Sequence, residues 1–470
     1  MSAGIVACNG ASSGIPALPA AFHGAPLSAN PIRHVVIAIQ ENRSFDDFFA
    51  TFPGADGTTV GKAAPMPPSI AESCSSPITK PTMVPLKEVP LVGNGQDLNH
   101  NHEAFDQSWN NGAMDGFDRT RIGAGGEGPP SCTYEYQYVN PQQIEPYWEI
   151  ARQYVLADHT FQTQGSGSFT AHQDLIAGGT QISANSALID TPTFFPWGCD
   201  ANPPVRTALI KKGSNKVYRY GGPFPCLSYA TLRDLLDAKG VSWKFYAMSV
   251  QKESGCEHGN TAGIWSAFDA IKAVRHSPEW QTNVTRTNLD FFSDISKHRL
   301  PAVAWITPDS LNSDHPGTTK HPPCEGGGQA RDTGPSWIAS LVNAIGKSSY
   351  WNSTALVVVW DDWGGFYDHV PPPRPRNWQG GPGFRVPMLI VSPYVKPHVD
   401  HTVYEFGSIL KFVESTWNLG SLGNNDAASQ SIGNAFDFSM SPRKFKMIPA
   451  KYSREYFLHQ KPSGEAPDTD

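Results

Sequence analysis

The chain has 470 residues, of which 39% are hydrophobic and 17% are charged, a composition typical of a globular protein with a large core. Its formal net charge is −7 and it contains no long basic run, so the composition argues against a nucleic-acid-binding surface. No apolar run in the sequence is long enough to span a membrane. The 43 glycines and 41 prolines predict many ordered loops on a rigid scaffold.

The first thirty residues are rich in Ser, Gly, Pro and Ala, and we expect residues 1–30 to form a flexible leader. Within them, the run IVACNG around Cys8 is similar to the end of a bacterial lipoprotein signal. The chain as given lacks the basic region and the long apolar region of a signal peptide. Either the true start lies upstream, with Cys8 as a lipid anchor, or the likeness is accidental.

Continuous apolar runs predict strands that are buried on both faces, at residues 34–40, 241–248, 302–307, 355–360 and 386–392. Helical periodicity appears between them, at residues 231–239, 335–345 and 406–419. This alternation predicts a mostly parallel sheet covered by helices on both faces. Pro-, Ser- and Gly-rich stretches predict long loop insertions at residues 54–90 and 198–225. We therefore expect one domain over residues 31–425, followed by a C-terminal extension over residues 426–470.

Six of the seven cysteines lie in loop-like surroundings, which favours disulfides and an oxidising compartment over free thiols in a cytosolic enzyme. None forms a close pair of the kind that binds zinc. Six cysteines allow fifteen pairings. Of these we prefer the sequential one, which is Cys74 with Cys132, Cys199 with Cys226, and Cys256 with Cys324.

Oxygen-bearing side chains follow two of the predicted strands. Glu41 and Asn42 follow the first strand, and Asp361 and Asp362 follow the fourth. Ligands bind at the carboxyl ends of parallel strands, and carboxylates gathered there repel one another unless a cation lies between them. Oxygen ligands predict one hard divalent ion, Ca²⁺, Mg²⁺ or Mn²⁺, rather than zinc. One such pair alone is more often a helix cap or a solvated turn, but two pairs at matching positions favour a site.

A nucleophile is expected in the segment QGSGSFTAH at residues 164–172, which precedes an apolar helical stretch. A hydroxyl at a helix N-terminus is well placed for phosphate, and a metal-bound serine alkoxide can attack phosphorus. By composition Ser166, Ser168 and Thr170 are all candidates, and a flexible loop is the alternative.

Two histidines, His100 and His315, lie in the polar segments DLNHNH and SDHP rather than on an apolar face. Such groups can protonate a leaving alkoxide or bind phosphoryl oxygens. A single surface histidine usually has no such role, so each is weak support on its own.

Four ordered segments resemble those of a known family: HVVIAIQENRSFDDFF, DLNHNHEAFDQSWNNGAMDGF, SDHPG and WDDWGGFYDHVPPP. The family is the phosphoesterase family of bacterial acid phosphatases and phospholipases C, which also includes plant non-specific phospholipases C. The resemblance covers roughly residues 32–420. It implies an α/β/α sandwich related to the fold of alkaline phosphatases and arylsulfatases.

The family's metal ligands match Glu41 with Asn42 and Asp361 with Asp362, and Trp363 stands where a histidine is commoner. In this family the nucleophile lies about ten residues before a glycine that closes the next apolar stretch, which gives Ser168. The Pro or Pro-Asn-Arg that usually follows the nucleophile is absent.

The resemblance also assigns the remaining groups of the site. His100 and His315 match the histidines of the family's Asp-x-x-His and Asp-His-Pro motifs. His258 and Asp314 are further candidates for substrate binding.

The implied reaction is a two-step displacement through a phosphoserine at Ser168, with one divalent metal ion and with His100 or His315 protonating the leaving group or stabilising charge. We expect an acid phosphatase or a broad phosphoesterase, because only a short tail follows Leu422. The alternative is a phospholipase C that releases a phosphorylated headgroup.

Two other classes of protein are alternatives. A sulfatase would need a Cys/Ser-x-Pro-x-Arg context, which is absent near Ser168. A non-catalytic surface-binding protein is the remaining alternative. The expected partner is a phosphate ester or phospholipid and not a nucleic acid, with peripheral or lipid-anchored membrane association. The expected location is extracytoplasmic in a bacterium, that is periplasmic, secreted or lipid-anchored.

Overall fold

The computed structural model describes residues 30–92, 96–123, 125–190, 197–214, 216–248, 263–316, 331–374 and 377–461. The predictions for Cys8, for His258 and for the Cys256–Cys324 pair fall outside these residues. All other candidate site residues lie within them.

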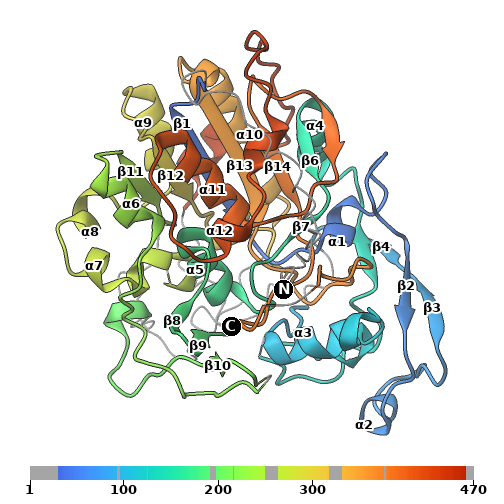
Figure 1. Cartoon of the computed structure of the whole chain (residues 1–470). Coiled ribbons are helices and arrows are strands. Elements are labelled where there is room, and N and C mark those ends of the chain that lie inside the picture. Colours follow the sequence, from blue (N-terminus) through green and yellow to red (C-terminus); the bar gives the residue numbers. More distant parts are fainter. Residues whose placement is uncertain are drawn as a thin grey trace, which may run out of the picture.

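A seven-stranded sheet forms the centre of the molecule (Figure 1). In spatial order its strands are β11 (Trp243–Tyr246), β12 (Val303–Ile306), β1 (His34–Gln40), β13 (Thr354–Trp360), β14 (Met388–Val391), β6 (Val155–Ala157) and β15 (His398–Asp400). Six of them run parallel, and β14 runs antiparallel to both of its neighbours. The predicted mostly parallel sheet is therefore confirmed, with the strand in residues 386–392 as the reversed one.

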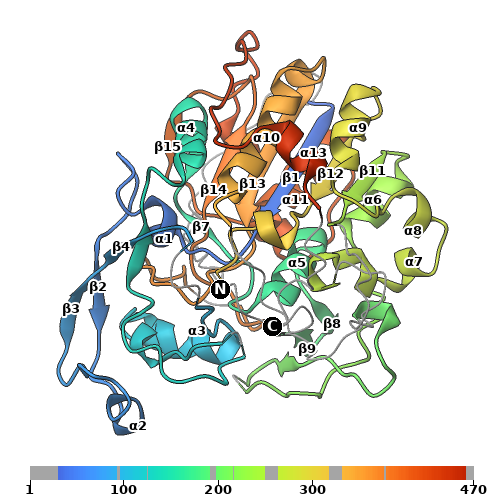
Figure 2. The ribbon, with the colours of Figure 1, turned by 180° about the vertical axis from the view of Figure 1, so that it is seen from behind.

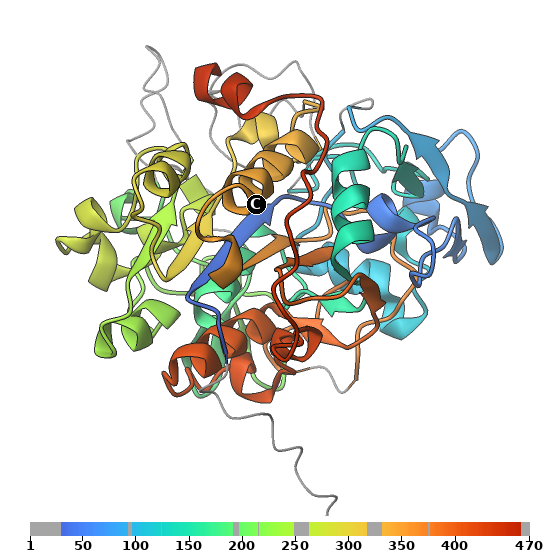
Figure 3. The same cartoon turned by 90° about the horizontal axis from the view of Figure 1, so that it is seen from above.

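Helices cover both faces of this sheet, as the views from behind and from above show (Figure 2, Figure 3). One layer holds α4 (Glu145–Gln153), α9 (Asp290–Ser296) and α10 (Gly334–Gly346). The opposite layer holds α5 (Ser168–Ala177), α6 (Leu232–Ala238) and α11 (Phe406–Trp417). Because both faces are covered, every residue of β12, β13 and β14 is buried. The α/β/α sandwich predicted from the sequence is confirmed.

Smaller elements fill the insertions. They are α1 (Phe45–Phe49), β2 (Val60–Ala63), α2 (Pro68–Ala71), β3 (Thr82–Pro85), β4 (Lys87–Val89), α3 (His102–Trp109), β5 (Gln137–Val139), β7 (Thr160–Phe161), β8 (Gln181–Ser183), β9 (Ser186–Leu188), β10 (Leu209–Lys211), α7 (Lys272–Arg275), α8 (Glu279–Thr282), β16 (Tyr404–Glu405), α12 (Asn425–Ala428) and α13 (Arg454–His459). In Figure 1, α3 and the sheet of β8, β9 and β10 lie below the central sheet. Beyond residue 425, Ile448 and Phe457 join the main hydrophobic core, so the predicted extension packs on the same core.

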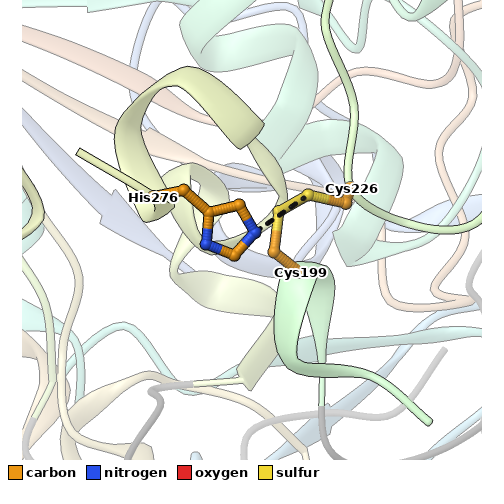
Figure 4. A group of neighbouring side chains, drawn as sticks. All are labelled: Cys199, Cys226 and His276. Carbon is orange, nitrogen blue, oxygen red and sulfur yellow. Dashed lines mark hydrogen bonds between the residues drawn. A yellow bond between two sulfur atoms is a disulfide. The ribbon is translucent and has the colours of Figure 1, made fainter. Parts of the chain in front are cut away.

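Two of the three predicted disulfides are present among the described residues. Cys74 is bonded to Cys132, and Cys199 is bonded to Cys226. The imidazole Nε2 of His276 lies 3.8 Å from the Cys226 sulfur, as the dashed line in Figure 4 marks. Both sulfurs of this second pair are consumed by the disulfide, so the group of two cysteines and one histidine is a covalent cross-link and not a thiolate metal site.

Candidate active site

The pairing of β1 with β13 brings the two predicted acidic pairs together. The strands are parallel and in register to their ends, with Gln40 beside Trp360. The next residues, Glu41 and Asp361, therefore leave the sheet side by side. The backbone N–H of Asn42 donates to Oδ1 of Asp361 at 3.1 Å. All four side chains of the two pairs are fully buried.

The electrostatics of this cluster favour a bound cation. Burial raises the pKa of the Asp361 carboxyl well above its ordinary value, and the negative charge of Glu41 raises that pKa further. Oδ1 of Asp361 accepts hydrogen bonds from the backbone, whereas its buried Oδ2 has no hydrogen-bond partner among the described residues. An ion bound against these oxygens would relieve both the crowding of negative charge and the unsatisfied oxygen.

Ser168 places its hydroxyl against the same cluster. It is the first residue of α5 and is fully buried. Its Oγ donates to Oδ2 of Asp362 at 3.0 Å, and it lies 3.4 Å from both Oε2 of Glu41 and Oδ1 of Asn42. The first turn of a helix also presents backbone N–H groups without partners inside the helix, which favour negative charge. The predicted nucleophile and the predicted metal ligands thus meet at one place.

The other two candidate hydroxyls point elsewhere. Ser166 donates to Oδ1 of Asp190 at 2.9 Å and lies 3.0 Å from the hydroxyl of Thr170. These bonds tie Ser166 to the loop that follows β9. Of the three hydroxyls left open by the sequence, Ser168 is therefore the one that contacts the acidic cluster.

His172 belongs to the cluster and was not predicted. It lies one helical turn after Ser168 on α5, so both side chains project from the same face. Its Nε2 lies 3.0 Å from Oε1 of Glu41 and 3.6 Å from Oδ2 of Asp361, and the side chain is fully buried. The spacing of four residues from the nucleophile is the signal that could have identified it, once residues 164–172 were taken as a loop leading into a helix.

His100 contacts the Asn42 and Asp362 part of the cluster. Its Nδ1 donates to the carbonyl of Leu98 at 2.6 Å, so in the neutral ring Nε2 is the acceptor. That nitrogen lies 3.1 Å from the amide nitrogen of Asn42 and 3.7 Å from Oδ2 of Asp362. The buried Trp363 donates its indole N–H to the His100 carbonyl at 3.4 Å. The tryptophan found in place of the commoner histidine therefore packs behind His100.

The segment with Asp314 and His315 supports the site from one side. The backbone N–H of Glu41 donates to the carbonyl of Ser313 at 2.9 Å. The His315 ring packs on Trp265, whose ring also packs on His172, with centroid distances of 6.4 and 6.5 Å. The structure thus connects His315 with the cluster through an aromatic contact, and its direct role in catalysis stays a prediction.

Asp314 turns its carboxylate toward the sheet. Oδ2 accepts hydrogen bonds from the Tyr147 hydroxyl at 2.5 Å and from the Gln40 amide at 3.2 Å. Burial raises the pKa of this carboxyl to about 7. These contacts are those of a residue that supports the end of β1, and the substrate-binding role of Asp314 stays a prediction.

The donor set fits a divalent metal ion. Glu41, Asp361 and His172 each offer a ligand atom, and these atoms all lie within 4.8 Å of one another. Asn42 and Asp362 add further oxygens around the Ser168 hydroxyl. The nitrogen of His172 changes the expectation of oxygen-only ligation, because imidazole also suits zinc and other transition metals.

An α/β/α sandwich whose strand ends hold a serine hydroxyl against buried carboxylates has the architecture of a metal-assisted hydrolase. The chain matches the model described as the Phosphoesterase family over residues 32–420, and it belongs to that family. It is accordingly a phosphoric ester hydrolase, as the sequence resemblance implied.

Curated relatives support this assignment. Phospholipase C B of Mycobacterium tuberculosis is 27% identical, over 90% of this chain and 80% of the relative. Non-hemolytic phospholipase C of Pseudomonas aeruginosa is 25% identical, over 89% of this chain and 59% of the relative. Among solved structures, a protein of the alkaline phosphatase superfamily from Vibrio parahaemolyticus is similar with a TM-score of 0.35 and 13% identity, over 79% of this chain and 77% of the other.

Proposed function

We propose that this chain is a metal-dependent phospholipase C that hydrolyses a phospholipid through a covalent intermediate on Ser168. The observation that carries the mechanism is the position of the Ser168 hydroxyl, 3.0 Å from Oδ2 of Asp362 within the buried acidic cluster. The phospholipid substrate is supported by the named activities of the relatives.

In the first step Ser168 Oγ forms a bond to phosphorus while the bond from phosphorus to the diacylglycerol oxygen breaks. The Ser168 proton passes to Asp362, toward which the hydroxyl already points. We assign the delivery of a proton to the departing oxygen to His100, with His315 as the second candidate. Water then attacks phosphorus and the bond from phosphorus to Ser168 Oγ breaks, so the phosphorylated headgroup leaves. The proton of the attacking water passes to the histidine that protonated the leaving group, and Asp362 returns its proton to Ser168.

Glu41, Asn42, Asp361, Asp362 and His172 would hold the metal ion, which supplies charge neutralisation and a lower pKa for the serine hydroxyl. Because Ser168 is the first residue of α5, the backbone N–H groups of that first turn would stabilise the negative charge that develops on the phosphoryl oxygens. Metal analysis of the purified protein would identify the ion.

We also propose that the protein acts outside the cytoplasm at a lipid surface. The two disulfides are typical of an oxidising compartment. Within the part of the chain that the structure describes, no helix combines the length and the apolar character required to cross a bilayer. The contact with lipid that we propose is peripheral or through a lipid anchor.

A substrate panel tests the proposal. Purified protein is assayed on phosphatidylcholine liposomes and on p-nitrophenyl phosphate, before and after exhaustive chelation. We expect headgroup release from liposomes at a kcat/KM at least about tenfold above that for the monoester, and loss of both activities on chelation.

Turnover of the monoester without liposome hydrolysis would instead support the phosphatase first expected from the sequence. Liposome hydrolysis that chelation leaves unchanged would contradict the metal-dependent mechanism.

A further inference from the structure

A second group of ligand-type side chains lies at the carboxyl ends of β6 and β15. The two strands are parallel neighbours, with Ala157 paired to Asp400 at their ends. The next residues, Asp158 and His401, therefore leave the sheet side by side, and His159 follows Asp158. This is the same register that brings β1 and β13 together at the candidate active site.

The three side chains converge on one point. Nδ1 of His401 lies 2.9 and 3.0 Å from the two carboxylate oxygens of Asp158. Nδ1 of His159 lies 3.8 Å from Oδ1 of Asp158, and the ligand atoms of all three residues lie within 4.8 Å of one another. Ligand atoms around a tetrahedral zinc ion, with bonds of about 2.0–2.1 Å, lie about 3.3–3.5 Å apart. The observed separations bracket that value.

The surroundings of this group are those of a supported metal site. Metal-binding histidines usually donate their second ring N–H to a carboxylate, which fixes the ring. Nε2 of His159 lies 3.0 Å from Oδ2 of Asp56. Nδ1 of His159 lies 3.2 Å from the backbone carbonyl of His401, and a bound ion would replace that contact. The backbone N–H of Asp56 in turn donates to Oδ2 of Asp158 at 2.8 Å, so Asp56 orients two of the three side chains.

A neighbouring group of three ligand-type residues differs from this one in how its charge is compensated. Asp46, Asp368 and His369 are also close together, but the guanidinium of Arg385 pairs with Asp368 and already compensates its charge. Arg385 also reaches Asp158, yet it donates to the backbone carbonyl and not to the carboxylate. Among the described residues, the ion-pair partners of the Asp158 carboxylate are histidines.

We propose that Asp158, His159 and His401 bind a second divalent transition-metal ion of the zinc class, separate from the candidate catalytic centre. A mixed set of two imidazoles and one carboxylate suits such an ion better than Mg²⁺ or Ca²⁺. The Asp158 carboxylate is fully buried, whereas the His401 side chain is 59% exposed, so an ion can enter from solvent. The bound ion replaces the proton between His401 and Asp158, and it joins the ends of β6 and β15.

Zinc binding by the full chain tests this site. Wild type, His401→Ala and His159→Ala are stripped with chelator, dialysed against ZnCl₂ and assayed for bound zinc by mass spectrometry and for the zinc-induced rise in Tm. We expect each variant to bind one equivalent less than wild type, whatever the candidate active site takes up, and to lose most of the rise in Tm.

The matched control is His398→Ala. His398 is an exposed histidine on β15, the strand that His401 follows, and its Nδ1 bonds to the carbonyl of Lys396. The control should bind as much zinc as wild type. Equal zinc content and equal Tm shifts in wild type and His401→Ala would overturn the proposal.

Discussion

Two groups of buried carboxylates lie beyond the end of β13, and they differ in what surrounds them. Nε and Nη2 of the fully buried Arg385 donate hydrogen bonds to the Asp368 carboxylate at 2.9 and 3.1 Å. The chain itself therefore supplies the positive charge that balances this carboxylate. Asp361 accepts hydrogen bonds from backbone N–H groups, lies beside the Glu41 carboxylate and has Nε2 of His172 3.6 Å from its Oδ2. The comparison separates a carboxylate built into the fold from one that is prepared for an ion or a reaction.

The largest expected effect is on catalysis at the Asp361 group. Ser168→Ala removes the hydroxyl that faces the acidic cluster, and we expect kcat/KM to fall by at least about 10³-fold with Tm nearly unchanged. Assays on liposomes with parallel thermal unfolding check this. Ser166→Ala is the matched control, because Ser166 bonds to Asp190 instead, and it should retain activity within about tenfold. Equal losses in both variants would show that the assignment of Ser168 is wrong.

The reverse pattern is expected where the chain supplies its own cation. Arg385→Met leaves the Asp368 carboxylate buried without its partner and should lower the free energy of unfolding by about 3–5 kcal/mol. Urea denaturation near neutral pH measures this.

Two further variants complete that comparison. Arg152→Met removes a half-exposed arginine that pairs with Glu149 on the surface of α4, and it should cost less than about 1 kcal/mol. Asp361→Asn should leave the metal-free protein at least as stable as wild type, because repulsion with Glu41 is lost. Strong destabilisation by Asp361→Asn would break the distinction between the two groups.

An effect smaller than those of Ser168→Ala and Arg385→Met is expected in the dependence of stability on pH. Burial raises the pKa of Asp314 from 3.8 to about 7, so the folded state holds this proton more tightly than the unfolded state does. At low pH the protonated carboxyl does not lower the free energy of unfolding. As pH rises from about 4 to about 7, its ionisation lowers that free energy progressively. Between about pH 4 and about pH 8, the free energy of unfolding of Asp314→Asn should rise by on the order of 1–3 kcal/mol relative to that of wild type. A difference in unfolding free energy that is independent of pH would refute this.

Much of the fold and of the site could be predicted because long apolar runs and the residues after them carry the information. The end of β1 and the end of β13 were both located correctly, and strand register then required Glu41 and Asp361 to meet. The three-residue strand β6 (Val155–Ala157) is too short to give a periodic signal. His172 was missed because a Gly- and Ser-rich segment hides where its helix begins.

The direction of β14 could not be read from its apolar run either, and it has a consequence for how ions load. Because β14 runs against its neighbours, its beginning lies at the edge where β13 and β6 end. Arg385, just before that beginning, donates to the Asp368 carboxylate on one side and to the Asp158 carbonyl on the other. The positive charge of Arg385 thus lies at the β14 position of this edge, between the candidate active site at the end of β13 and the Asp158, His159 and His401 group at the end of β6. We therefore expect an ion bound at one of these two sites to have little effect on the occupancy of the other.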